Sequence, residues 1–257
     1  MSLRSGARIR CVFAVAAFLA APSASFAQLK VMTSGGFAAA YREILPEFEK
    51  TTRITVTTAS GASQGPGPNT IGAQLRRGVP ADVVILAREG LDDLIAEGRI
   101  VRGTDKDLAQ TPLGVAVRAG ALRPDISTVD AFKQMLLRAK SVTFASSTTG
   151  IYLTTKLFPK LGIADELARK STTAAVASVA SGEAEIAIQP ISELLHVAGV
   201  DYVGPIPTEI QYVSVFSAAV VAGSKEPEAA TRLIAFLSSG NAVAAIRKSG
   251  MEPPRRR

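Results

Sequence analysis

The chain has 257 residues, of which 29 are Lys or Arg and 22 are Asp or Glu, and its formal net charge is +7. Its single cysteine, Cys11, lies in an N-terminal apolar run and its single histidine is His196, so the composition excludes a disulfide framework and multi-histidine metal motifs. The basic residues form no stripe interleaved with aromatic residues, which argues against nucleic-acid binding.

The N-terminus predicts an export signal. Arg4, Arg8 and Arg10 precede the apolar run CVFAVAAFLA, and Ala27 ends a small-x-small cleavage pattern. We therefore expect residues 1–27 to be removed after Ala27, and the mature protein to act in the periplasm. A membrane anchor is disfavoured because the run is far shorter than the roughly 20 apolar residues that span a bilayer. Without its three arginines, the net charge falls from +7 to +4.

Strand and helix patterns then alternate. Residues 29–34 (LKVMTS) predict a strand, and apolar side chains three and four positions apart from Phe37 to Phe48 predict a helix that Pro46 should bend. The other elements predicted in this part are a strand at 53–60, helices at 70–78 and 89–100, and a strand at 81–87. That last strand is apolar almost throughout, as in a parallel sheet covered on both faces. The alternation predicts an α/β lobe built of βαβ units.

The pattern changes near Leu108. The elements predicted next are an extended run at 111–120, helices at 129–140, 148–158, 173–182 and 191–199, strands at 141–146 and 185–190, a second extended run at 209–223, and helices at 227–239 and 241–250. Ser127 or Thr128 is the expected N-cap of the 129–140 helix. The two extended runs are long enough to join two lobes. We predict a first lobe of residues 28–108 plus 218–257 and a second of 109–217, with hinges at 108–117 and 211–220.

Gly61, Ser63 and Gly65 form a G-x-S-x-G pattern, which is typical of a nucleophilic serine in hydrolases. That chemistry requires a helix to begin directly after the serine, and here QGPGPNT intervenes. The helix is expected to start near Thr70 instead, and the base would have to be His196. A serine hydrolase therefore stays an alternative, disfavoured by this local context.

The same loop can bind an anion without catalysis. Hydroxyl-rich loops follow three predicted strands, at Thr33 and Ser34, at 60–63, and at 146–149. Each loop leads into a helix, whose N-terminal amides and partial positive charge favour anions. Open α/β sheets bind ligands at the carboxyl ends of their strands. The alternative is that these hydroxyls only cap helices, but three such loops in two lobes favour a shared binding site.

Several segments, in this order, are similar to a known family. They are VMTSGGFAAAYREILPEFEKTT, the ASG loop after the second strand, QLRRGVPADVVILA, GLDDLIAEGRIV, SVTFASSTTGIYLTTKLFPKLGI and VASGEAEIAIQPISELL. From about Leu29 to Ser249 the chain resembles the type II periplasmic solute-binding proteins of ABC importers, especially the molybdate-binding branch. The resemblance implies two α/β lobes joined by two crossing strands, and a ligand clamped between them and delivered to an inner-membrane permease. It also implies a protein that is not an enzyme.

Carried over by position, the resemblance implies ligand donors from the loop residues of both lobes, which are Thr33, Ser34, Ser60, Gly61, Ser63, Ser147, Thr148 and Thr149. Gln189 stands where molybdate binders place a tyrosine, and Arg88 follows the strand at 81–87 directly. An arginine at a cleft edge favours a carboxylate held by two hydrogen bonds, whereas a solvated Arg88 is the alternative. The expected ligand is therefore a small anion, either a molybdate-like oxyanion or a small carboxylate.

The remaining expectations concern partners. The sequence gives no sign of a metal or organic cofactor, and a monomer is the expectation for this architecture. A sensory or scavenging binding protein that never meets a permease remains a further alternative.

Overall fold

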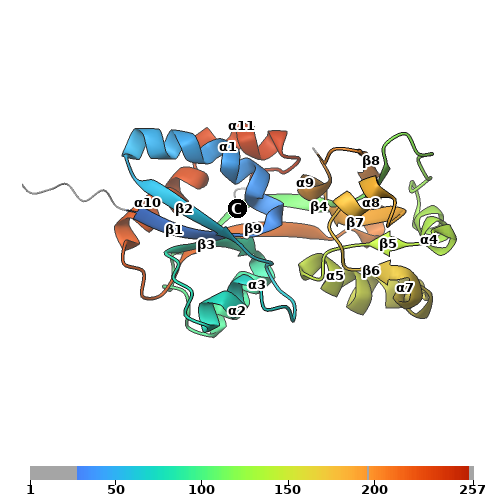
Figure 1. Cartoon of the computed structure of the whole chain (residues 1–257), viewed down its shortest axis with the longest axis horizontal. Coiled ribbons are helices and arrows are strands. Elements are labelled where there is room, and N and C mark those ends of the chain that lie inside the picture. The colour runs from blue at the N-terminus through green and yellow to red at the C-terminus, as the bar shows by residue number, and fades with distance from the viewer. Residues whose placement is uncertain (1–27, 196, 255–257) are drawn as a thin grey trace, which may run out of the picture.

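The computed structural model describes residues 28–195 and 197–254, so the predicted signal segment 1–27 and His196 lie outside the described residues. The described chain forms two α/β lobes side by side, joined by two long strands (Figure 1). These strands are β4 (Lys106–Arg118) and β9 (Val213–Val220). The arrangement of two lobes and two connecting strands is the one predicted.

The first lobe comes from both ends of the described chain. It contains β1 (Gln28–Thr33), α1 (Gly35–Thr52), β2 (Thr55–Ser60), α2 (Ile71–Arg76), β3 (Val83–Ala87), α3 (Arg88–Ala96), α10 (Pro227–Leu237), a 3-10 turn (Gly240–Ala242) and α11 (Val243–Lys248). The second lobe contains α4 (Val129–Arg138), β5 (Val142–Thr143), α5 (Thr148–Tyr152), a π-helical turn (Leu153–Leu157), α6 (Phe158–Leu161), α7 (Ala164–Lys170), β6 (Ser171–Thr172), α8 (Ala177–Ser181), β7 (Ile186–Pro190), α9 (Ile191–Leu194), β8 (Val200–Pro205) and a 3-10 turn (Thr208–Ile210).

The sheet passes through both lobes in the order β2-β1-β3-β9-β4-β7-β5-β6, with β8 paired to β4. In the first lobe, β1 runs parallel to β2 and β3, and β9 is antiparallel to β3. β4 changes partners along its length: Lys106–Pro112 pairs with β9, and the stretch from Leu113 onward pairs with β7 and β8. The passage between the lobes therefore lies near Pro112 in β4, within the hinge range predicted for that strand.

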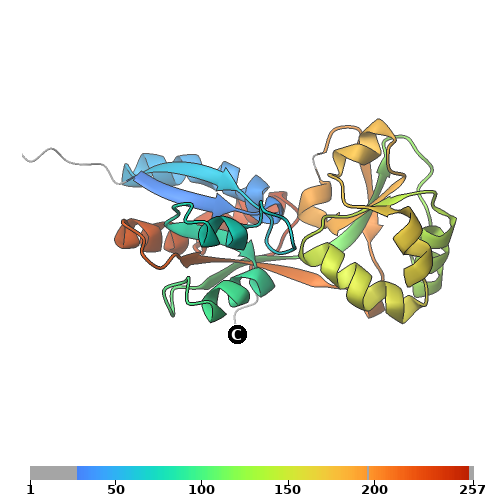
Figure 2. The same ribbon diagram turned by 60° about the horizontal axis from the view of Figure 1, so that its bottom comes forward.

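The first-lobe sheet is covered on both faces. Val83 and Ile85 of β3 belong to the core beneath α1, α10 and α11, whereas Val84 and Leu86 pack on the opposite side against α2 and α3. Figures 1 and 2 show α1 and α11 on one side of this sheet and α2 and α3 on the other. The predicted double-sided burial of this strand is confirmed.

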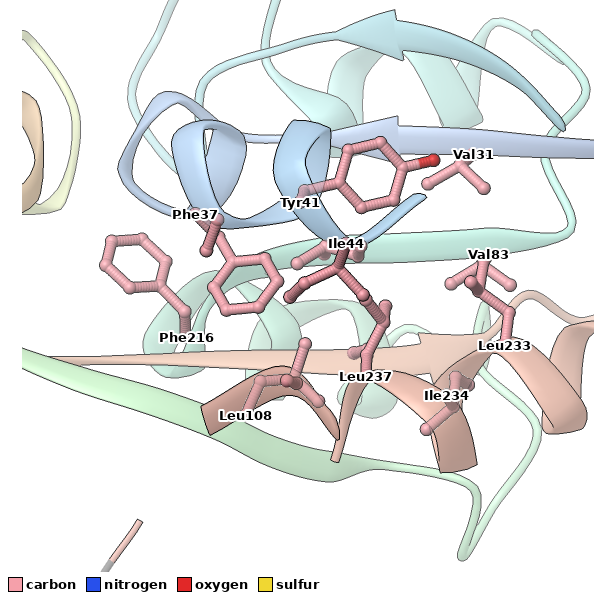
Figure 3. Packing of buried hydrophobic residues seen from close by; sticks show 14 of the residues in the cluster. Val31, Phe37, Tyr41, Ile44, Val83, Leu108, Phe216, Leu233, Ile234 and Leu237 are labelled. Atoms are coloured by element: carbon pink, nitrogen blue, oxygen red, sulfur yellow. The ribbon is translucent and has the colours of Figure 1, made fainter. Parts of the chain in front are cut away.

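α1 presents its apolar face to this core. Phe37, Tyr41, Ile44 and Phe48 lie one helical turn apart and are all at most 4% exposed. Figure 3 shows Phe37 and Ile44 pointing toward the side of the core that holds Phe216 and Leu237, and the Tyr41 ring beside Val31. Each such buried side chain contributes about 1.5–3 kcal/mol. The helix continues through Pro46 to Thr52. Pro46 lies on the exposed face, where water can bond the carbonyl that loses its amide partner.

α10 and α11 complete the first lobe. Leu233, Ile234 and Leu237 of α10 point into the core (Figure 3). Within the described ranges no single helix is long and apolar enough to cross a membrane; α10 and the stretch Gly240–Lys248 reach that length and composition only as a pair bent by 57°.

The second lobe departs more from the prediction. β5 covers only two residues of the strand expected at 141–146, and α9 covers four of the nine residues expected in a helix at 191–199. The elements α7, β6 and β8 were not predicted at all. Thr128, one of the two N-cap residues proposed from the sequence, is the N-cap of α4, and its side chain accepts a hydrogen bond from the amide of Ala131.

Candidate functional site

A cleft of about 390 Å³ lies between the lobes and is lined by residues of both. Most of the predicted donors line it, namely Ser34, Ser60, Gly61 and Ser63 from the first lobe and Ser147, Thr148 and Thr149 from the second. Thr33, Arg88 and Gln189 are not among the lining residues. The three hydroxyl-rich loops therefore meet at one site, as expected from the carboxyl ends of their strands.

Ser34 and the first turn of α1 present hydrogen-bond donors to the cleft. Ser34 is the N-cap of α1, yet its side chain makes no capping bond and its Oγ is buried without a partner among the described residues. Its own amide donates to the carbonyl of Ile85 at 2.8 Å. The first amides of a helix have no intrahelical acceptor, and no described backbone group outside α1 accepts from Gly35 or Gly36. These groups are available to an anion.

Gly36 packs directly against the ring of Phe216 at the N-terminus of α1. A Cβ at Gly36 would lie 1.9 Å from the ring carbon Cζ of Phe216, which also lines the cleft. Only glycine leaves room for both the Phe216 ring and the N-terminus of α1. Thr33, one position before Ser34, is buried and turns its hydroxyl back to the carbonyl of Ser34 at 3.3 Å.

Ser63 is held by the backbone of the first lobe. Its Oγ accepts a hydrogen bond from the amide of Ala87 at 2.9 Å, which leaves the hydroxyl proton to donate into the cleft. α2 begins only at Ile71, after the capping side chain of Thr70, which accepts from the amide of Ala73. Ser63 is thus not at a strand-to-helix elbow, and the required base His196 lies outside the described residues. The geometry is that of a donor and does not favour a nucleophile.

Gln64 connects the two lobes through hydrogen bonds to residues that line the cleft. Its amide faces Ser147 Oγ at 3.4 Å, its Oε1 accepts from Thr148 Oγ1 at 3.2 Å, and its Nε2 donates to Asp93 Oδ2 at 2.8 Å. Next to it, Gly65 has φ of +113°, and a Cβ there would lie 2.4 Å from the carbonyl oxygen of Ser146. The long first-lobe loop therefore touches the second lobe directly, and the lobes are in contact around the cleft.

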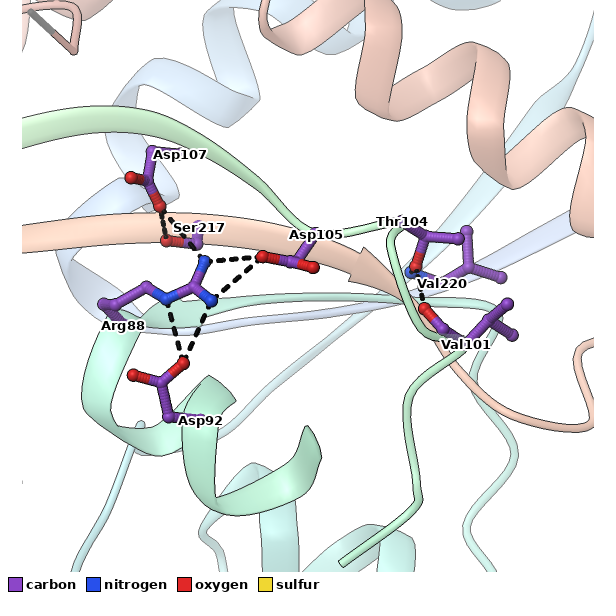
Figure 4. A network of polar contacts seen from close by, with 8 residues as sticks. All are labelled: Arg88, Asp92, Val101, Thr104, Asp105, Asp107, Ser217 and Val220. Atoms are coloured by element: carbon purple, nitrogen blue, oxygen red, sulfur yellow. Dashed lines mark hydrogen bonds and ion pairs between the residues drawn. The ribbon is translucent and has the colours of Figure 1, made fainter. Parts of the chain in front are cut away.

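Arg88 is surrounded by carboxylates of the first lobe (Figure 4). Nη1 and Nη2 both contact Asp105 Oδ2 at 2.9 Å, Nε donates to Asp92 at 3.0 Å, and Nη1 reaches Asp107 at 3.3 Å. Asp107 also accepts from Ser217 Oγ. These aspartates neutralise the charge of Arg88 within the first lobe, and Arg88 is not among the lining residues of the cleft, so its contact with a ligand stays a prediction. Arg88 is not the freely solvated arginine of the alternative prediction either, because three aspartates form ion pairs with it.

Gln189 is buried at the end of β7. It is 2% exposed, and its Oε1 has no partner among the described residues. Its backbone pairs with Gly114 of β4. The next residue, Pro190, lines the cleft, whereas Gln189 is not among the lining residues.

Glu193, which was not predicted, is the titratable residue that lines the cleft. It lies in α9, and its Oε2 would be 3.3 Å from a Cβ on Gly35, so the carboxyl group faces the N-terminus of α1. No hydrogen bond or ion pair joins its carboxyl to another described residue. Burial raises the pKa of Glu193 from 4.5 to about 7. A carboxyl-bearing residue three positions after the end of β7 is the sequence signal that points to Glu193.

A larger hollow of about 740 Å³ lies in the second lobe alone, beside Arg118, Arg123, Arg138 and Lys140. Since residues of only one lobe line it, movement of the lobes would not close it. No group of three or more His, Cys, Asp or Glu residues within 28–195 and 197–254 is arranged to hold a metal ion.

The chain belongs to the family of bacterial extracellular solute-binding proteins, whose model matches residues 29–252. A curated relative from a Pseudomonas species is 40% identical over 229 residues, covering 88% of this chain and 87% of the relative. That relative is named aconitate isomerase. The chain is thus similar over nearly its whole length to a protein named as an enzyme, within a family of binding proteins.

Solved structures share the two-lobe fold. The periplasmic molybdate-binding protein of Azotobacter vinelandii has a TM-score of 0.72 at 22% identity and covers 88% of this chain and 100% of its own. The sulfate-binding protein of Mycobacterium tuberculosis has a TM-score of 0.68 at 18% identity, and the match covers 89% of this chain and 88% of that protein. At these identities the similarity establishes the fold alone. The predicted class, a two-lobe α/β protein of the periplasmic binding type, is confirmed.

Proposed function

We propose that the protein captures a small polycarboxylate anion in the cleft between its lobes. The observation that carries this proposal is the convergence of neutral donors from both lobes: the Ser34 hydroxyl and α1 amides on one side, and Thr148 and Thr149 on the other. The described lining residues include no Lys, Arg or His. A helix N-terminus and hydroxyl groups bind an anion without a cationic side chain.

The size of the cleft and the curated relative favour a carboxylic acid over a tetrahedral oxyanion. A cleft of about 390 Å³ is within the range of organic ligand sites, about 300–1,000 Å³, and a single oxyanion would leave much of it empty. The 40% identical relative is named for an organic acid. Gln189, in place of the tyrosine of molybdate binders, supports the same choice.

Thermal unfolding of the purified protein tests the ligand class. The panel comprises cis- and trans-aconitate, citrate, tricarballylate, succinate, molybdate, tungstate, sulfate and phosphate. A ligand present at 100 times its Kd should add about 2.7 kcal/mol to the stability of the folded state. We expect a rise in Tm with tricarboxylates and none with molybdate. A rise with molybdate and tungstate alone would contradict the carboxylate assignment, and no rise across the panel would contradict the anion site.

In the transport role, the exported monomer would deliver its ligand to an inner-membrane permease after the lobes close by a hinge motion around β4 and β9. Family membership supports this role. Closure joins donors from both lobes, so the closed form differs from the open one in a way a permease can recognise. Deleting the gene should abolish uptake of the labelled ligand at low concentration. Unchanged uptake would favour a role without a permease.

A second candidate activity is isomerisation of the bound acid by proton transfer. The observation that favours it is Glu193, a carboxyl group inside a cleft that otherwise presents donors to an anion. The ionised form of this carboxyl group repels an anionic ligand, whereas proton transfer requires a group that can accept and return a proton. Incubation with cis- or trans-aconitate, followed by chromatography, should show conversion of one into the other. Absence of conversion with proven binding would leave the transport role.

A further inference from the structure

Glu193 combines three features that the binding role does not use. It comes from the second lobe, its carboxyl group lies against Gly35 of the first lobe, and no described residue pairs with it. α9 packs against α1 as well as against β4 and β7, so the carboxyl group is fixed across the cleft from the helix N-terminus. Its ordinary partner, a cation, is absent from the described lining.

The N-terminus of α1 can hold one carboxylate of a ligand beside Glu193. Ser34 is 3% exposed, and its hydroxyl has no hydrogen-bond partner among the described residues. α1 is an 18-residue helix whose first amides face the cleft. A carboxylate bound by these donors places its attached carbon next to Oε2 of Glu193. Negative charge that moves onto this carboxylate is then stabilised by the same amides and hydroxyl.

The protonation of Glu193 suits a group that must both accept and return a proton. Burial alone raises its pKa to about 7, so both forms are populated near neutral pH, which is the condition for efficient general acid–base catalysis. No charged side chain contributes to this shift, and Glu193 is the titratable group among the described lining residues.

We infer that Glu193 carries the proton in an allylic isomerisation of an unsaturated polycarboxylate whose reacting end is bound at the N-terminus of α1. This inference rests on the isomerase activity proposed above. The Glu193 carboxylate removes a proton from a CH₂ group that lies between a carboxylate and a carbon–carbon double bond. The C–H bond breaks, and its electron pair spreads over the allyl carbons and the carboxylate oxygens.

Glu193, now a carboxylic acid, then gives the proton to the far carbon of the former double bond. A new C–H bond forms there, and the double bond moves by one position. The new double bond is cis or trans according to how the former CH₂ arm was oriented in the cleft. No water, oxidant, reductant or second substrate is consumed, so the atoms and electrons balance within the substrate and Glu193.

Deuterium exchange tests this inference separately from binding. The wild-type protein, Glu193→Gln and Glu193→Asp are incubated with trans-aconitate in D₂O, and proton NMR follows both deuterium incorporation and cis–trans conversion. The matched control is Glu183→Gln, which alters an exposed glutamate of the same lobe. Binding of trans-aconitate is measured for each variant by calorimetry, and circular dichroism checks its fold.

We expect Glu193→Gln to bind trans-aconitate at least as tightly as wild type and to slow cis–trans conversion by about 100-fold or more. Glu193→Asp should retain slow conversion, and Glu183→Gln should equal wild type. Conversion by Glu193→Gln at the wild-type rate would overturn the inference. Binding by the wild-type protein without any conversion would also overturn it and leave the binding function intact, whereas absence of binding would overturn the proposed function itself.

A second measurement does not depend on a variant that folds. The wild-type value of kcat/KM for cis–trans conversion should rise with pH through an inflection near 7, because only the ionised carboxylate removes the first proton. A rate that is flat between pH 5 and 8 would contradict the assignment of Glu193.

Discussion

The two lobes contribute differently to the cleft. The first lobe supplies donors that are fixed by its own backbone: Ser63 accepts from the amide of Ala87, and Ser34 is tied to Ile85. The second lobe supplies hydroxyls that also contact the opposite lobe through Gln64, together with the carboxyl group of Glu193. The first lobe therefore resembles a preformed anion site, and the second adds the groups whose position depends on lobe contact.

The space at Gly36 provides the strongest test of the preformed first-lobe site. A Cβ there would lie 1.9 Å from Phe216, and overpacking of this kind costs about 1–3 kcal/mol. Gly72, in α2, would place its Cβ at ordinary contact distances of 3.5 Å, so Gly72→Ala should gain up to about 1 kcal/mol. We expect urea unfolding to separate the two variants by about 3 kcal/mol, with ligand binding lost only in Gly36→Ala. Equal stabilities would refute the packing argument.

The pH dependence of stability distinguishes Glu193 from the neutral donors. Its folded pKa, about 7, is higher than the ordinary 4.5, so the folded state holds the proton more tightly than the unfolded state. Its full contribution to stability is present below about pH 4.5 and is lost as the pH rises to about 7. Without ligand, Glu193→Gln should therefore stabilise the protein at pH 8 by at most about 3 kcal/mol, and should leave it unchanged near pH 4.

Urea unfolding at both pH values measures this effect, and Glu183→Gln serves as the exposed control. A gain for Glu193→Gln that is the same at pH 4 and pH 8 would show that proton binding by Glu193 is not its cause.

Ser63→Ala tests the fixed donor of the first lobe. The substitution leaves the amide of Ala87 without its acceptor, which costs about 1–3 kcal/mol for a buried donor. We expect reduced stability and weaker ligand binding together. Thr148→Val, in the second lobe, should weaken binding with little change in stability, because the Thr148 hydroxyl bonds Gln64 and no other described residue. Ester hydrolysis that disappears in Ser63→Ala would instead revive the hydrolase alternative.

The smallest effect is expected at Arg88. Replacement by Gln removes the ion pairs with Asp92, Asp105 and Asp107, all of which are partly exposed, so the loss of stability should be about 1 kcal/mol. Calorimetry should give an unchanged Kd, because Arg88 is outside the lining. A large loss of affinity would return Arg88 to the ligand site predicted from the sequence.

The sequence predicted the loops of the site better than its individual side chains. The alternation of strand and helix patterns, together with the positions where strands end, determines which loops meet at one edge of the sheet. Ser34, Ser63 and Thr148 do meet there. The ion pairs of Arg88 involve aspartates 17 and 19 residues further along the chain. A local sequence pattern does not show that these residues are close in space. Glu193 faces Gly35, from the other lobe, so its role follows only from the tertiary contact between α9 and α1.

The pairing of β3 with β9 also affects how the chain folds. The first lobe remains incomplete until β9, α10 and α11 have been made, because its sheet and its core both need them. Contacts between such distant segments form slowly, since a long loop must close first. A chain made from its N-terminus therefore lacks a complete first lobe until its last forty or so residues emerge. Late folding of this kind would suit the export that residues 1–27 predict, because a chain threaded through a membrane has to remain unfolded until it has crossed.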